Sequence, residues 1–144
     1  MMWLWLIWLL FLPSIVDVVS IHNLQSKKAS TCSHETNSFT LWWIYDEISN
    51  DVIFKMTSRS SMKNYWSGFF IGDKRPIDAL GVFVIGDRMN LMDGHVTSFG
   101  NIKIDNITNV QPIKLQSQDR VLTAEFARPL TAIDSFDVDL SSCV

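Results

Sequence analysis

Apolar and polar residues alternate with a period of two through most of this 144-residue chain, and this pattern restricts its fold more than any other feature. In the segment 52–57, Val52, Phe54 and Met56 share one face of an extended strand, because successive side chains of a strand point to opposite sides. Such segments recur every 8–12 residues, and no convincing stretch has the period of an amphipathic helix. The pattern predicts an all-β sandwich and excludes a parallel α/β fold.

The expected strands are 39–45, 52–57, 66–71, 80–85, 89–92, 95–98, 110–115 and 120–126. The polar segment 46–51 is typical of a turn and joins the first two strands into a hairpin. Gly-Asp follows the third and fourth strands directly, which is a turn signal. Asp93-Gly94 is predicted to be a tight hairpin turn between the strands on either side of it.

The chain begins with an apolar run of twelve residues that Pro13 ends. Residues 18–20 then place small or modest side chains where signal peptidase reads its substrate. A retained membrane anchor is the other interpretation, but a membrane-spanning helix needs about 20 apolar residues and polar residues interrupt this run. We expect residues 1–20 to be a signal peptide, 21–31 a polar leader and 32–144 a single domain.

The charge of the chain excludes several classes of partner. The formal net charge is −3, so the chain is nearly neutral and slightly acidic. Such a chain has no electrostatic basis for binding nucleic acid or anionic lipid. After signal cleavage we expect a secreted, extracellular protein without membrane association, whose partner is a small ligand or an extracellular protein.

Two cysteines and one glycosylation sequon agree with secretion. Cys32 and Cys143 bracket nearly the whole domain and lack the spacing of a zinc site. In an oxidising compartment they are expected to form a disulfide, the alternative being two free thiols. Asn106 begins the Asn-Ile-Thr triplet, so it is the expected site of N-glycosylation in a glycoprotein.

No catalytic constellation can be assembled from these residues. A Ser-His-Asp or Cys-His set is missing, because His95 is the one histidine in the body of the domain and has no evident orienting partner. The aspartates are scattered through turns without the pattern of a calcium-binding loop. We therefore expect that the chain is not an enzyme and holds no metal.

Several motifs follow one another in an order shared with a known family. They are an early cysteine, the aromatic strand Leu41-Trp42-Trp43, its partner 51–56, Trp66-Ser67-Gly68-Phe69, an Asp-Gly turn, and Phe126-Ala127-Arg128-Pro129-Leu130 with two following aspartates. In this order the chain resembles the DOMON domain, a module named after the N-terminal region of dopamine β-monooxygenase. The resemblance covers about residues 32–143 and is to the small, secreted, stand-alone members.

The resemblance implies an immunoglobulin-like antiparallel β-sandwich of about ten strands, usually extracellular, that binds haem or sugar-like ligands or serves as an interaction module. It also implies a structural role for the closing motif. Pro129 cannot donate to a continuing strand ladder. Arg128 is therefore expected to bond Asp134, Asp137 or nearby carbonyls and to fix the return of the final segment.

The haem-binding relatives hold iron between a methionine and a histidine. Their methionine follows the Trp-x-Gly-Phe strand by about ten residues, where this chain reads 73–78 without a methionine. Their histidine lies late in the domain, whereas this chain has none after His95. Met89 and Met92 are near His95 in sequence but do not reproduce the family's pairing. Haem is therefore disfavoured, and we expect no cofactor.

A sugar-binding site needs an aromatic side chain with polar groups around it. Trp42 and Trp43 are adjacent and must point to opposite faces of a sheet, so one of them can meet a ligand. The candidate ligand-binding residues are Trp43, Trp66 and His95. The leading prediction is a secreted, non-catalytic module that binds a sugar-like or apolar ligand or a protein partner. The alternative is a b-type haem domain for extracellular electron transfer.

Overall fold

A computed structural model describes residues 32–72, 77–98, 100–133, 135, 137–138 and 140 of the chain. The predicted signal peptide, the polar leader, Asp134 and Cys143 lie outside the described residues, as do residues 73–76 of the segment 73–78. Within the part that is described, there is no helix with the length and hydrophobicity that a membrane span requires.

The described chain is all-β and forms two antiparallel sheets. One sheet has five strands in the order β1-β2-β3-β9-β8, and the other has four in the order β4-β5-β6-β7. The strands are β1 (Cys32–Glu35), β2 (Phe39–Asp46), β3 (Asp51–Arg59), β4 (Asn64–Ile71), β5 (Asp78–Ile85), β6 (Arg88–Val96), β7 (Ile102–Ile104), β8 (Gln111–Gln118) and β9 (Val121–Pro129). The all-β prediction is thus confirmed, with nine strands in the described residues where about ten were expected.

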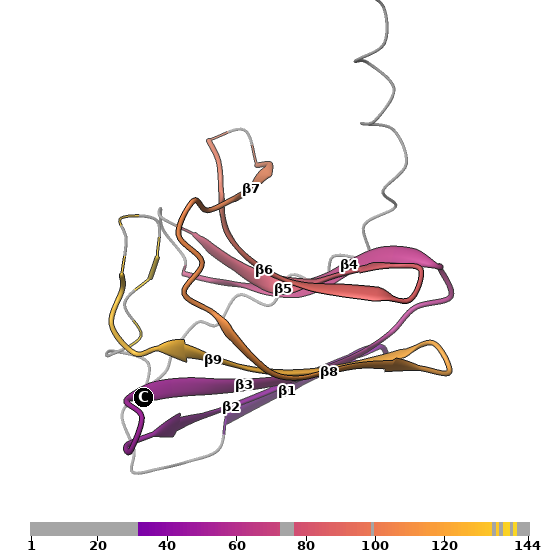
Figure 1. Cartoon of the computed structure of the whole chain (residues 1–144), viewed down its shortest axis with the longest axis horizontal. Coiled ribbons are helices and arrows are strands. Elements are labelled where there is room, and N and C mark those ends of the chain that lie inside the picture. The colour runs from indigo at the N-terminus through magenta and orange to yellow at the C-terminus, as the bar shows by residue number, and fades with distance from the viewer. Residues whose placement is uncertain are drawn as a thin grey trace, which may run out of the picture.

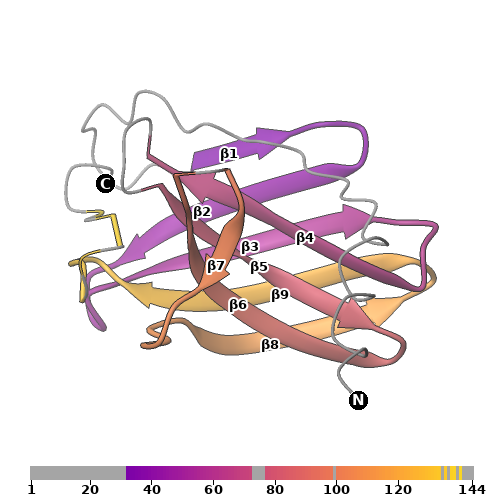
Figure 2. The ribbon, with the colours of Figure 1, turned by 90° about the horizontal axis from the view of Figure 1, so that it is seen from above.

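The two sheets face each other in a sandwich-like arrangement, and their strands run obliquely across one another (Figures 1 and 2). Aromatic side chains from both sheets meet between the layers. The ring of Phe69 in β4 lies 5.1 Å from that of Phe54 in β3 and 6.2 Å from that of Phe126 in β9. All three residues are fully buried, so the apolar faces predicted by the alternation form the core.

The first predicted hairpin is confirmed. β2 pairs with β3 in continuous register from Phe39 opposite Ser58 to Asp46 opposite Asp51. Asn50 has a φ of 60° in the connecting turn, a left-handed conformation that asparagine tolerates better than most residues. The hydroxyl of Tyr45 donates to the side-chain oxygen of Asn50 at 2.9 Å, which fixes this turn to the strand before it.

The predicted turn at Asp93-Gly94 is wrong. Both residues lie inside β6, where Asp93 pairs with Leu80 and Gly94 with Ala79 of β5. Gly94 is required for close packing instead, since an added Cβ would lie 2.5 Å from the carbonyl oxygen of Lys103 in β7. The true turn between β5 and β6 contains Gly86, whose φ is +62°.

Two glycines allow β4 and β5 to approach closely. Gly68 lies opposite Gly81, and an added Cβ on Gly68 would be 2.2 Å from the carbonyl oxygen of Leu80. We expect Gly68→Ala to lower the free energy of unfolding by about 1–3 kcal/mol, because the clash is with backbone that cannot move aside. Urea denaturation measures this loss. Ser33→Thr adds the same methyl group at an exposed strand position and should change stability by less than about 0.5 kcal/mol. An equally small effect of Gly68→Ala would refute the steric argument.

Candidate functional site

A hollow opens where β3 leads into β4, between the ends of the two sheets. It encloses about 290 Å³, including its opening to solvent. Its lining includes four serines and three larger side chains: Ser38, Ser58, Ser60, Ser67, Arg59, Tyr65 and Trp66. The hollow is therefore rich in hydroxyl groups, with one cation and the three aromatic rings of Phe39, Tyr65 and Trp66.

Among the hollow-lining residues, the indole Nε1 of Trp66 and the hydroxyl of Ser58 are buried polar atoms without a hydrogen-bond partner in the described part of the chain. Trp66 is 7% exposed and Ser58 is 5% exposed. Buried polar groups in proteins nearly always have a partner, and where the protein supplies none it is commonly water or a ligand.

Trp66 does not present an open aromatic face. Its ring lies across Gly68 and Gly81, where an added Cβ would approach the indole within 2.6 and 3.0 Å respectively. It also stacks on Phe70, with ring centroids 6.0 Å apart. The glycines therefore make room for the tryptophan against the sheet, and only a small part of its ring remains exposed in the hollow.

The structure separates the three predicted ligand-binding residues. Trp43 is 8% exposed and packs in the core between the sheets, which leaves Trp42 as the partly exposed member of the adjacent pair. Trp66 lines the hollow. His95 lies in β6, where its Nδ1 is bonded to the carboxylate of Asp105. The three residues do not form one site.

An ionic cluster is buried between the sheets near the end of β9. The guanidinium of Arg128 is fully buried and pairs with the carboxylate of Asp78, the first residue of β5. Its Nη2 lies 3.4 Å from Oδ1 of Asp137 and donates to the carbonyl oxygen of Val138 at 3.1 Å. Arg128 thus joins the end of β9 to the other sheet and to the segment after β9 that contains Asp137 and Val138, which we call the closing segment. A bond from Arg128 to Asp137 is one of those that the sequence predicted.

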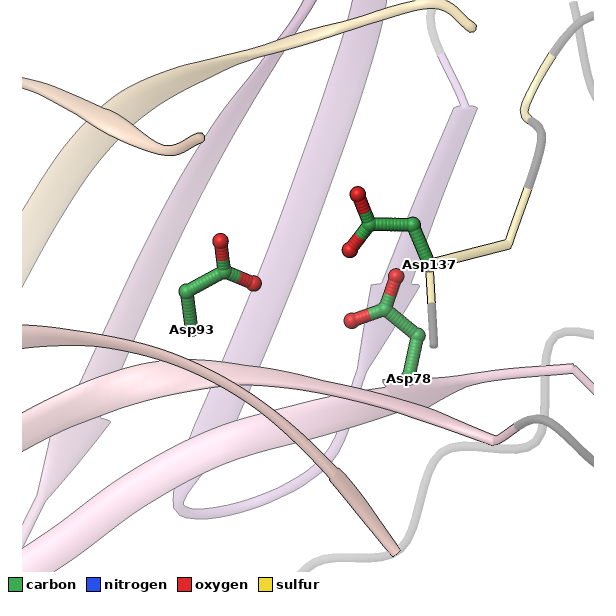
Figure 3. Close-up of side chains that lie close together, drawn as sticks. All are labelled: Asp78, Asp93 and Asp137. Carbon is green, nitrogen blue, oxygen red and sulfur yellow. The ribbon is translucent and has the colours of Figure 1, made fainter. Parts of the chain in front are cut away.

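Asp93 and Asn109 extend this cluster. Oδ2 of Asp93 accepts a hydrogen bond from the backbone N–H of Asn109 at 2.8 Å, and the side-chain amide of Asn109 donates to Asp137. The carboxylates of Asp78, Asp93 and Asp137 come from β5, β6 and the closing segment and point toward one another (Figure 3). Three acidic groups therefore converge on one buried point.

Burial has a large effect on two of these carboxyl groups. Desolvation raises the pKa of Asp78 to about 7, although the guanidinium of Arg128 and the N–H of Val138 act in the opposite direction. Desolvation also raises the pKa of Asp93 to about 6, against the hydrogen bond from Asn109. The environment thus opposes negative charge at both positions more strongly than the protein compensates for it.

The methionine and histidine considered for haem do not face each other. Met92 packs with Trp66 and Ala79 in a small cluster apart from the main core, whereas Met89 packs against the main core. His95 lies on the same face of β6 as Met89 but six residues farther along the strand, which is about 20 Å at the usual rise of a strand. Neither pair can hold one iron atom.

Several residues of these two sites were not found from the sequence. Asp78 could have been suspected, because it directly precedes the apolar run 79–85 and an acidic residue at a buried position needs a partner. Asp93 could not, because Asp-Gly is typical of tight turns. Asn109 and the serines of the hollow could not have been found in this way, since isolated polar residues near strand ends are common.

Asn106 of the sequon is exposed between β7 and β8, which makes it accessible for the predicted glycosylation.

No protein-family model matches the chain, and no curated protein shows significant sequence similarity to it.

Proposed function

We propose that this chain is a secreted, non-catalytic recognition module that holds a small, sugar-like ligand in the hollow between β3 and β4. The observation that carries this proposal is the lining of the hollow, to which four serines and an arginine contribute together with Trp66. Hydroxyl groups that both donate and accept suit a polyhydroxylated ligand.

The size of the hollow limits the ligand. Its volume of about 290 Å³ includes its opening to solvent, so the hollow is a surface depression that does not enclose a ligand. A sugar would rest at this opening, where the small exposed part of Trp66 contacts an apolar patch of the ring and Arg59 and the serines bond its hydroxyls.

The compartment and the family complete the proposal. We infer that the chain is a small DOMON-like member with an immunoglobulin-like sandwich, secreted after removal of residues 1–20 and glycosylated at Asn106. The order of the motifs supports this inference, and so do the two facing antiparallel sheets. The buried ion pair of Arg128 with Asp137 supports the same inference, because the resemblance implies a structural role for the closing motif.

Replacing Trp66 with phenylalanine tests the site. The change keeps an aromatic ring and removes Nε1, so we expect the affinity for a bound sugar to fall about 10-fold, equivalent to about 1.4 kcal/mol. Saturation-transfer NMR with a panel of mono- and disaccharides identifies the ligand, and titration gives the dissociation constants. Arg59→Met should weaken the same sugar to a similar degree.

Trp42→Phe is the matched control, because Trp42 is partly exposed and does not line the hollow. It should bind the sugar as the unaltered chain does. Circular dichroism of all three variants establishes that they are folded. The proposal fails if no sugar of the panel binds at millimolar concentration, or if the control variant loses as much affinity as Trp66→Phe.

A further inference from the structure

The ionic cluster between the sheets carries more negative charge than its single cation balances. The exposed fractions of Asp78, Asp93 and Asp137 are 0%, 1% and 6%, and Arg128 is fully buried. When all four are ionised, the cluster has an excess of two negative charges. Burying an uncompensated ion costs several kcal/mol even after relaxation of the protein. The cluster therefore requires either bound protons or a divalent cation.

The geometry of the carboxylates fits a cation of calcium's size. One ligand oxygen from each of the three aspartates lies within 4.8 Å of the others. Oxygen ligands about 2.3–2.6 Å from Ca²⁺ can be up to about 5 Å apart, whereas those about 2.1 Å from Mg²⁺ are at most about 4.2 Å apart. Three oxygens at this spacing can surround Ca²⁺ without a rearrangement, and the directions of the side chains in Figure 3 agree with this.

A further polar atom beside the acidic group lacks a partner. The side-chain oxygen of Asn109 has no hydrogen-bond partner in the described residues, although Asn109 is 6% exposed. The nitrogen of the same amide donates to Asp137, which places the end of this side chain beside the cluster. Carboxylate and amide oxygens are the ligands that Ca²⁺ takes in proteins.

The hydrogen bonds leave suitable oxygens available on two of the aspartates. Arg128 pairs with Oδ2 of Asp78, and the N–H of Asn109 binds Oδ2 of Asp93. Oδ1 of Asp78 and Oδ1 of Asp93 have no hydrogen-bond partner among the described residues. With the oxygen of Asn109 these are three unpaired acceptors among the described residues. The donors there without a hydrogen bond are Nε and Nη1 of Arg128, and Nη1 forms the ion pair with Asp78. The unpaired oxygens thus outnumber the donors available to them, and a bound cation would coordinate the oxygens that remain.

We propose that Asp78, Asp93 and Asp137, together with the side-chain oxygen of Asn109, form a calcium site beside Arg128. One divalent ion neutralises the excess charge. It also connects β5 and β6 with the segment before β8 and with the closing segment. The site is independent of the sugar-binding hollow, which shares none of these residues.

Calcium binding to the chelator-treated full chain tests the proposal. Equilibrium dialysis should show one Ca²⁺ per chain with a dissociation constant of about 10⁻⁴–10⁻³ M, the range of extracellular modules. Mg²⁺ should bind at least about 10-fold more weakly. Calcium at ten times its dissociation constant should raise the Tm by about 5 °C.

Asp93→Asn tests whether calcium binds at this cluster or only through the overall negative charge of the chain. Asparagine can still accept the hydrogen bond from Asn109, but the substitution removes one charge from the cluster. We expect it to weaken calcium binding at least about 10-fold. Asp87→Asn in the exposed turn between β5 and β6 is the control and should leave binding unchanged. Absence of stoichiometric binding by the unaltered chain at 10-fold the upper limit, about 10 mM, overturns the proposal. So does equal affinity in folded Asp93→Asn, and the measurement on the unaltered chain decides alone if that variant does not fold.

Discussion

Arg128→Met is expected to lower the free energy of unfolding by about 3–5 kcal/mol. Methionine can occupy much of the space of the arginine side chain, but it leaves the carboxylate of Asp78 without its cation. Both Arg128 and Asp78 are 0% exposed, so solvent cannot replace the lost interaction. Urea denaturation in the presence of EDTA measures the effect independently of any bound calcium.

The double variant Arg128→Met with Asp78→Asn distinguishes an unpaired charge from lost packing. Asparagine removes the charge and keeps an oxygen that can accept from the N–H of Val138, which lies 3.3 Å from Oδ2 of Asp78. Removing both partners of a buried ion pair is often nearly neutral. The double variant should therefore recover at least about half of the stability that the single variant loses.

The control is Arg88→Met, at an exposed position at the start of β6. It should change the free energy of unfolding by less than about 0.5 kcal/mol. If Arg128→Met has an effect as small as this, the buried pair is not a major source of stability. If instead the double variant is as unstable as the single one, the loss arises from packing around the arginine stem.

The strands and the all-β class could be predicted because the alternation of apolar and polar residues is a local pattern that recurs from strand to strand. Phe39, Leu41 and Trp43 alternate with Thr40 and Trp42, and the first three are buried in the core. The same alternation also indicated which tryptophan of the adjacent pair would face inward, since Trp43 has the parity of the other two apolar residues. The choice of Trp43 as a ligand-binding candidate did not take into account that Trp43 lies on the same strand face as these buried residues.

The sites could be predicted only in part, because their residues meet through pairing between strands that are distant in sequence. Asp93-Gly94 has the sequence of a tight turn, yet Gly94 is needed where β7 passes close to β6 and Asp93 is needed in the ionic cluster. A local rule cannot distinguish these uses of the same dipeptide. Likewise, a structural role for Arg128 could be predicted because the neighbouring Pro129 ends the strand. That Asp78 is its partner could not be predicted, because Asp78 lies fifty residues earlier in the chain and on the other sheet.

We propose that Cys32 and Cys143 form a disulfide, and we expect its loss in Cys143→Ser to lower the free energy of unfolding by about 2–5 kcal/mol. Cys32 begins β1, which lies at the edge of the five-stranded sheet and pairs with β2. The N–H of Leu140 in the closing segment donates to the carbonyl of Leu130, the residue after β9, at 2.8 Å. A bond from Cys143 to Cys32 would connect this segment to the edge strand and restrict the unfolded chain over a long loop.

Three variants decide whether the two thiols act as one bond. Cys32→Ser, Cys143→Ser and the double variant should show the same loss of stability, because each removes the same disulfide. Non-reducing peptide mapping of the secreted protein should recover the two cysteine peptides joined. Complete alkylation of both thiols without reductant would rule the disulfide out. In that case the losses of the single variants would add in the double variant, as expected for two separate side chains, and β1 would depend on its pairing with β2.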